Sequence, residues 1–132
     1  MNAATPELIR QRAGNRCEYC LLRQEQTGLR HHVEHIIAKQ HHGSDDAANL
    51  ALACNRCNAH KGPNLTGIDP ASGALVELFH PRRDVWTDHF EFQGPRIVGL
   101  TATGRATVYV LAMNDERRVE RRAELRALGE LP

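Results

Sequence analysis

The amino-acid sequence predicts an α+β fold, in which a small core held together by four cysteines is followed by a C-terminal region of β-strand and helix. The core is predicted by two Cys-x-x-Cys pairs and by the short apolar segments that lie between them. The C-terminal helix is predicted by residues 115–128, which are charged and carry apolar side chains on one side. At 132 residues, the chain is expected to form a single domain.

The composition is that of a soluble globular protein, with 41% hydrophobic and 25% charged residues. No apolar run approaches the roughly 20 residues needed to span a bilayer. The first twelve residues lack the apolar centre of a signal peptide, so we expect a cytoplasmic protein with no membrane partner. The formal net charge is only +1, so phosphate contacts would have to come from local patches.

The cysteines form two pairs, Cys17-x-x-Cys20 and Cys54-x-x-Cys57. Two thiolates at this spacing can bind one metal ion, and two such pairs complete a tetrahedral site. The 33-residue gap exceeds the usual ribbon spacing and requires an insert that folds as its own unit. The alternatives are disulfides, which a reducing cytoplasm disfavours, and a redox dithiol, which would not normally occur twice. Four sulfur ligands leave no open position, so the zinc would be structural and would add folding energy.

The N-terminal elements follow from capping and turn residues. Thr5 is predicted to cap a helix over residues 6–13, because a first-turn proline and an acidic residue follow it, and the helix should end at Gly14-Asn15. Further along, we expect a strand over 29–37, a polar loop over 39–48 that contains Gly43, a short strand over 49–53 and the start of a helix over 58–61.

The C-terminal elements are bounded by turn signals. A turn at 69–73 leads into an expected strand over 74–79, and a turn at Gly94-Pro95 splits two further expected strands, over 86–92 and 97–100. Residues 103–113 fit a strand or a helix, and we predict a helix capped by Thr103. Trp86 and Phe90 are expected in the core. The arginine pairs at 82–83, 117–118 and 121–122 are expected to be solvated, with a DNA contact by one of them as the alternative.

The residues that carry chemistry lie between and just after the cysteine pairs. Five of the eight histidines fall between His31 and His42. On a strand, Glu34 and His35 would point to opposite faces, so a bend or bulge would be needed to bring both to one metal–water cluster. His32 shares the face of Glu34 and is expected either to brace the site or to lie at the surface.

The order of these residues resembles that of HNH endonucleases of the variant with a four-cysteine zinc site. The stretch Glu34-His35-Ile36-Ile37 is followed by Gly43, by Asn49-Leu50 and by Cys54-x-x-Cys57-Asn58-x-x-Lys61-Gly62. The resemblance covers about residues 17–62, and the remainder resembles small stand-alone bacterial HNH proteins more loosely. It implies a ββα-metal core, in which two strands and one helix hold a single divalent cation.

The resemblance also implies the roles of the site residues. His35 matches the general base, Glu34 the acidic metal ligand, and Asn58 the position at which the family places its last histidine or asparagine. Carboxylate and amide oxygens suit Mg²⁺ or Mn²⁺. Asn49 matches the middle asparagine, and we expect it to hold the loop and orient His35. A helix cap is the alternative for Asn58. The residues expected to contact nucleic-acid phosphates are Lys61, Arg56 and Lys39.

The implied function is metal-dependent hydrolysis of DNA phosphodiester bonds. The expected substrate is mainly double-stranded DNA, cleaved with low sequence specificity to 5′-phosphate and 3′-hydroxyl ends by nicking or double-strand cleavage. No small-molecule substrate is expected, and the oligomeric state stays open. The alternative function is a non-catalytic, zinc-stabilised module that binds nucleic acid.

Overall fold

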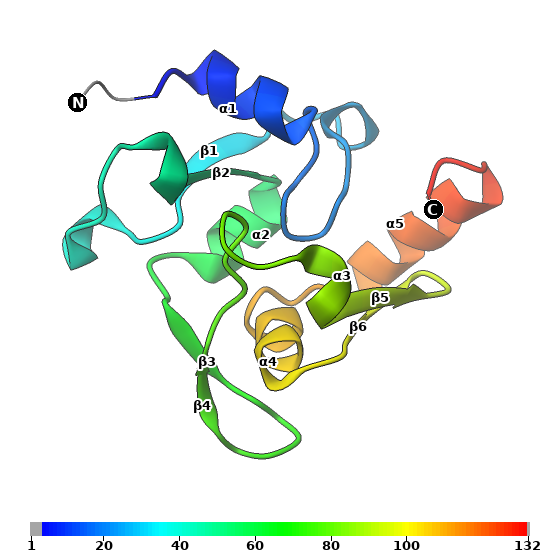
Figure 1. Ribbon diagram of the computed structural model, residues 1–132. Coiled ribbons are helices and arrows are strands. Elements are labelled where there is room, and N and C mark those ends of the chain that lie inside the picture. Colours follow the sequence, from blue (N-terminus) through cyan, green and yellow to red (C-terminus); the bar gives the residue numbers. More distant parts are fainter. Residues whose placement is uncertain (1–3, 132) are drawn as a thin grey trace. The chain divides into compact units, whose positions relative to one another are not determined.

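The computed structural model describes residues 4–131 and divides into two compact units, which are treated separately (Figure 1). The first unit holds the chain up to Leu65 together with His80–Asp84. The second unit holds Thr66–Phe79 and the chain from Val85 onward. The predicted α+β class is confirmed, because short antiparallel strand pairs alternate with helices. Among the described helices, none has the length and apolar character needed to cross a membrane.

The first unit opens with helix α1, Pro6–Ala13, as predicted. Thr5 caps it by accepting a 3.2 Å hydrogen bond from the amide of Leu8, and the helix stops at Gly14, which has the left-handed φ of 63°. The buried side chain of Ile9 packs against Leu50 and Leu52. This small apolar cluster attaches the helix to the strand pair that carries the site.

Strand β1, His32–His35, pairs antiparallel with β2, Leu50–Ala53, and helix α2, Asn55–Lys61, follows directly. This is the expected ββα arrangement, although β1 is shorter than the predicted strand over 29–37. Helix α2 begins three residues earlier than predicted because Cys54 is its N-cap, with Sγ accepting from the amide of Cys57. Asn58 therefore lies inside the helix, and the helix-cap alternative for it is wrong.

The loop between β1 and β2 contains two 3-10 turns, Lys39–His41 and Ala47–Asn49. A third, Gln24–Gln26, lies between the first cysteine pair and β1. The pairing of β1 with β2 runs without interruption from His32 opposite Ala53 to His35 opposite Leu50. The expected bulge at Glu34 and His35 is therefore not formed.

The second unit contains two hairpins and three helices. Strand β3 pairs with β4, and β5 pairs with β6, both antiparallel. The bounds are Thr66–Ile68 for β3, Leu75–Glu77 for β4, Trp86–His89 for helix α3, Phe90–Gln93 for β5, Arg96–Gly99 for β6, Ala102–Val110 for helix α4 and Glu116–Ala127 for helix α5. The strand predicted over 86–92 is thus wrong in its first half. The helical turn of α3 brings the ring of Trp86 against the ring of Phe90, four residues later, with the ring centroids 5.1 Å apart.

Two further predictions for the second unit need correction. The helix predicted over 103–113 is present as α4, but its cap is Thr101, whose Oγ1 accepts from the amide of Gly104 at 3.0 Å. The arginines of α5 are not all solvated, because Arg118 and Arg122 are buried. Their guanidinium groups donate to backbone carbonyls of the segment before α5, where the irregular chain leaves acceptors free.

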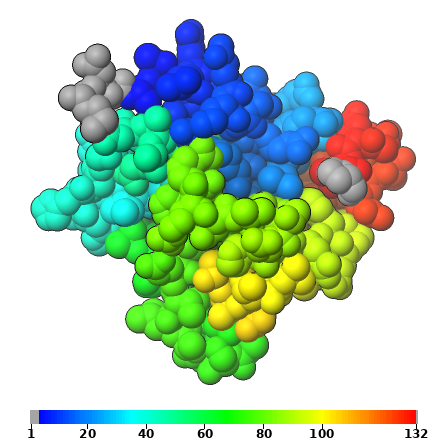
Figure 2. Space-filling model, in the orientation of Figure 1, coloured from blue at the N-terminus to red at the C-terminus, as the bar shows by residue number. Residues whose placement is uncertain are grey.

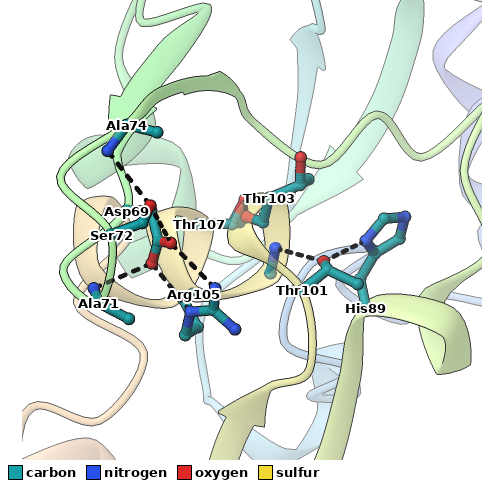
Figure 3. A network of polar contacts seen from close by, with 10 residues as sticks. Asp69, Ala71, Ser72, Ala74, His89, Thr101, Thr103, Arg105 and Thr107 are labelled. Atoms are coloured by element: carbon teal, nitrogen blue, oxygen red, sulfur yellow. Dashed lines mark hydrogen bonds and ion pairs between the residues drawn. The ribbon is translucent and has the colours of Figure 1, made fainter.

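Close backbone packing and an ion pair with a buried carboxylate join the β3–β4 hairpin to α4. The β3–β4 hairpin lies beside α4 (Figure 2), and a Cβ on Gly67 would come within 2.8 Å of the side chain of Val110. Asp69 is fully buried at the end of β3, where Arg105 of α4 donates to both carboxylate oxygens at 2.8 and 2.9 Å (Figure 3). Ser72 donates to the same carboxylate at 2.6 Å, so the turn and the helix are joined by one charged group.

Candidate active site and cysteine cluster

The four cysteines converge on one point inside the first unit. Their sulfur atoms all lie within 4.8 Å of one another, and all four side chains are buried and free of disulfides. The Sγ atoms of Cys20 and Cys54 are 3.7 Å apart. Tetrahedral zinc with Zn–S bonds of about 2.3 Å places its sulfur ligands about 3.8 Å from one another. The cluster therefore has the donor atoms and the spacing of a structural zinc site.

The electrostatics of the cluster favour a bound cation. Burial raises the pKa of the Cys17 thiol, and likewise that of Cys57, well above the ordinary value. Four buried thiolates without a counter-ion are therefore unfavourable, whereas a divalent metal stabilises the deprotonated sulfurs. Backbone amides also face the sulfurs, because the amides of Cys20 and Cys57 donate to the first cysteine of each pair at 3.4 Å.

The wide gap between the pairs is bridged by strand β2. The amide of Glu18 donates to the carbonyl of Leu52 at 2.8 Å, and the amide of Leu52 donates back to the Glu18 carboxylate at 2.8 Å. Glu18 also pairs with Arg82 of the same unit. The first cysteine pair is thus attached to the strand that leads into the second pair.

His35 lies at the end of β1 with its side chain 30% exposed. Its Nε2 is 2.7 Å from Oδ1 of Asp45, and the ammonium of Lys39 lies 3.0 Å from the same oxygen. Hydrogen bonds from His35 and Lys39 hold the pKa of the Asp45 carboxyl below its usual value. Within residues 4–131, Nδ1 of His35 has no hydrogen-bond partner, so this nitrogen is available to a solvent molecule.

Asp45 was not among the residues predicted from the sequence. It belongs to the polar run Gly-Ser-Asp-Asp at residues 43–46, a composition that predicts only a loop. The signal that could have found it is its place inside a loop whose ends are joined, ten residues after the histidine. A carboxylate in such a loop can fold back onto the imidazole and fix its tautomer and orientation.

Asn49 joins the two ends of this loop. Its Oδ1 accepts from the amide of Ile37 at 2.8 Å, and its Nδ2 donates to the carbonyls of Ile37 and Ser44 at 3.0 and 2.8 Å. The loop closes tightly at Gly43, where a Cβ would lie 1.7 Å from the carbonyl oxygen of Ile37. The expected loop-holding contacts of Asn49 are thus present, and they set the path of the chain from His35 to Asp45.

Glu34 lies on the opposite face of β1 from His35 and is only 7% exposed. The hydroxyl of Tyr19 donates to its Oε1, and the ammonium of Lys61 lies 3.1 Å from its Oε2. Burial raises the pKa of Glu34, while Lys61 and Tyr19 act against this shift. The structure therefore does not bring the Glu34 carboxylate together with the imidazole of His35.

The remaining residues predicted for the site differ in how exposed their side chains are. Lys61 is 2% exposed and faces Glu34 rather than solvent, a placement that does not support a phosphate contact. Arg56 and Lys39 are exposed. Asn58 is half-buried on α2, and its side-chain amide bonds to no residue between 4 and 131. Of the neighbouring histidines, His31 is buried with Nε2 2.9 Å from the carbonyl of Leu22, and His32 is exposed.

The predicted ligands of a catalytic cation fit such an ion only in part. Asn58 offers an unbonded amide oxygen, but both carboxylate oxygens of Glu34 already accept hydrogen bonds inside the fold. Among the described residues, the cysteines are the one group of three or more histidine, cysteine or acidic side chains with converging ligand atoms. As placed, Glu34 and Asn58 do not form a ready cation site.

Part of the chain is similar to a known protein family. Residues 17–64 match the family model described as HNH endonuclease, which spans both cysteine pairs, β1, β2 and α2. No curated protein and no solved structure gives a significant match to the chain. The matched segment begins at Cys17 and ends three residues after Lys61, so it contains every predicted site residue. Over residues 17–64, the chain is therefore similar to the HNH endonuclease family.

Proposed function

We propose that this domain hydrolyses DNA phosphodiester bonds with His35 as the general base. The observation that supports this proposal most directly is how the two ring nitrogens of the imidazole are hydrogen-bonded. Nε2 is held by Asp45 at 2.7 Å, while Nδ1 is unbonded and the side chain is 30% exposed. A neutral imidazole held in this way keeps a proton on Nε2 and presents the lone pair of Nδ1 to a water molecule. When Nδ1 takes the proton, the nearby Asp45 carboxylate stabilises the resulting charge.

The nucleic-acid partner is proposed from the family match and from the exposed cations beside the site. Lys39 lies next to Asp45, and Arg56 lies in the first turn of α2. Both side chains are exposed and are proposed to contact phosphates on either side of the bond that is cleaved. Contacts of this kind carry no sequence information, which agrees with a nuclease of low specificity acting mainly on double-stranded DNA.

A requirement for Mg²⁺ or Mn²⁺ is also proposed, because the HNH resemblance implies it. Such an ion would neutralise phosphate charge and stabilise the leaving oxygen. Asn58 has an amide oxygen available to it. Glu34, the other expected ligand, would first have to give up its contact with Lys61.

The experiment that tests the proposed function is plasmid nicking by the full chain loaded with one equivalent of zinc. The protein is dialysed free of other divalent ions, mixed with supercoiled DNA, and then supplied with Mg²⁺, with Mn²⁺ or with neither. We expect nicked product only after one of these ions is added, with the zinc content unchanged. Protein that shifts DNA on a gel but never nicks it would instead identify a zinc-stabilised nucleic-acid-binding module.

A further inference from the structure

A buried polar network joins the cysteine cluster to the strand that carries His35. The ammonium of Lys61 lies 3.1 Å from Oε2 of Glu34, 3.3 Å from the carbonyl oxygen of His35 and 3.0 Å from that of Ile36. The two charged side chains are 3% and 7% exposed. The other oxygen of Glu34 accepts from the hydroxyl of Tyr19, which is itself fully buried.

The hydrogen-bonding capacity of Lys61 is used completely in this network. An ammonium has three hydrogens and no acceptor, and here three oxygens surround it. A carboxylate and two backbone carbonyls are also the kind of oxygen cage that a small hard cation would take. Lys61 thus fills the place beside Glu34 with its own positive charge, and the carboxylate is neutralised without an external ion.

The network reaches both halves of the cysteine cluster. Tyr19 lies between the two cysteines of the first pair, and Lys61 is the last residue of α2, the helix that begins at the second pair. Glu34 sits between them on β1. Because the cysteine cluster fixes the positions of Tyr19 and α2, it also fixes the Tyr19 hydroxyl and the Lys61 ammonium, which hold Glu34.

The carbonyls bound by Lys61 belong to His35 and to the residue that follows it. The carbonyl of His35 and that of Ile36 lie where β1 stops pairing with β2, just before the loop. On the loop side, the amide of Ile36 donates to the carbonyl of Asn49 at 2.8 Å, and the amide of Ile37 donates to Oδ1 of Asn49 at the same distance. Lys61 and Asn49 thus both hold the backbone that follows His35, and Asp45 holds the imidazole ring.

From this geometry we infer that Lys61 is a positioning residue that fixes the backbone of His35, and that Glu34 is its internal counter-ion rather than a ligand of a catalytic cation. The inference concerns the same site as the proposed nuclease and rests on it for the role of His35. It reverses two expectations from the sequence, which assigned Glu34 to the metal and Lys61 to phosphate.

The test compares four variants of the zinc-loaded full chain: Lys61→Met, Glu34→Gln, the double variant Glu34→Gln/Lys61→Met, and His60→Met as an exposed control on the same helix. Lys61→Met alone leaves a buried carboxylate without its counter-ion, so its Tm should fall most. The double variant removes both charges, while the glutamine amide oxygen can still accept from Tyr19, so its Tm should recover most of the way to that of the wild type.

The double variant separates positioning from stability. We expect its kcat to fall by tenfold or more, while KM for DNA and the Mn²⁺ concentration that gives half-maximal rate stay within twofold of the wild type. We also expect hydrogen exchange at the amides of Ile36 and Ile37 to become at least tenfold faster. The amide of Cys17, bonded to the carbonyl of Leu22 at 2.8 Å, serves as the internal reference that should not change.

Two results would overturn the inference. One is a rise of tenfold or more in the half-maximal Mn²⁺ concentration for Glu34→Gln with its Tm maintained, because that would make Glu34 a cation ligand. The other is wild-type protection of Ile36 and Ile37 in the folded double variant, because Lys61 would then not fix the end of β1. The exchange measurement needs no cleavage, so it decides the inference even if the wild-type protein fails to cut DNA and the proposed function is lost.

Discussion

The imidazole of His35 and the carboxylate of Asp45, ten positions apart in the chain, lie 2.7 Å from each other across a loop. The loop brings them together because Asn49 ties its two ends and because the chain at Gly43 passes against the carbonyl of Ile37. The base of the proposed reaction is therefore not an isolated histidine. It is one end of a loop whose internal hydrogen bonds decide which ring nitrogen faces solvent.

Asp45→Asn should reduce the cleavage rate without unfolding the domain. The amide keeps the size of the carboxylate, but it cannot stabilise a protonated imidazole by charge, and it can hold the ring in the wrong tautomer. We expect kcat to fall about 10–100-fold, the range seen when an outer partner of a functional histidine is lost. Steady-state cleavage and thermal unfolding would be measured together. The matched control is the same substitution at the neighbouring residue, Asp46→Asn, which should leave kcat within twofold of the wild type. An equal fall in kcat in both variants would speak against a specific role for Asp45.

Gly43→Ala should disturb the same loop through sterics alone. A Cβ at this position would lie 1.7 Å from the carbonyl oxygen of Ile37 and 2.9 Å from Nδ2 of Asn49, so the loop has to open. We expect slower cleavage and faster exchange of the Ile37 amide, together with a loss of stability of about 1–3 kcal/mol, as for other overpacked sites. Gln40→Ala, in the exposed part of the loop, is the control. If the Ile37 amide of Gly43→Ala exchanged its hydrogen at the wild-type rate, the loop would be looser than its contacts indicate.

Cys54→Ser tests the cysteine cluster separately from the helix cap. Serine is a favoured N-cap, so α2 keeps a capping oxygen while the metal site loses one thiolate. We expect zinc to bind less tightly and the variant to unfold at a lower temperature and at lower chelator concentration than the wild type. Metal analysis and thermal scans with a zinc chelator would measure both effects. A variant that retains wild-type zinc content and Tm would remove Cys54 from the ligand set.

Asp69 should make the second unit sensitive to acid. Its hydrogen bonds with Arg105 and Ser72 lower the pKa of the carboxyl far below the ordinary aspartate value of about 4. Because the folded pKa is depressed, the stabilisation is present above a pH of about 4 and is lost as the pH falls toward the folded value. Asp69→Asn should therefore be less stable than the wild type at neutral pH. The difference in free energy of unfolding between the two proteins should shrink as the pH falls below about 4.

The single tryptophan, Trp86, lies in the second unit and reports its unfolding by fluorescence. Denaturant titrations at several pH values would give the difference between wild type and variant. Asp88→Asn, at an exposed position of α3, should show no such pH-dependent difference. A constant gap between wild type and Asp69→Asn from neutral pH down to about pH 3 would show that the ionised carboxylate is not what stabilises the turn.

Much of the first unit could be predicted from the sequence because its signals are local. The cap at Thr5, the stop at Gly14 and the paired cysteines each depend on a few neighbouring residues. The side-chain partners could not be predicted in the same way. Asp45 reaches His35 only because Asn49 closes the loop, and Lys61 reaches Glu34 only because α2 starts at a cysteine that also belongs to the cluster.

The second unit was harder to predict because side-chain packing and free backbone acceptors, rather than helix or strand propensity, decide how its elements form. The segment 86–92 has the aromatic residues of a strand, but packing of Trp86 on Phe90 favours a helical turn before the strand begins. The arginines of α5 look like a solvated face, yet two of them satisfy carbonyls in the segment before that helix. Neither contact follows from the helix or strand propensity of the residues alone.

The central claim, that His35 removes the proton from the attacking water, is tested most directly by single-turnover cleavage with excess zinc-loaded enzyme. His35→Ala and the wild type would be compared on the same DNA in Mg²⁺ or Mn²⁺, with DNA affinity and Tm measured in parallel. We predict that the variant binds DNA within twofold of the wild type and cleaves it about 10²–10⁴-fold more slowly. Cleavage by folded His35→Ala at the wild-type rate would contradict the account.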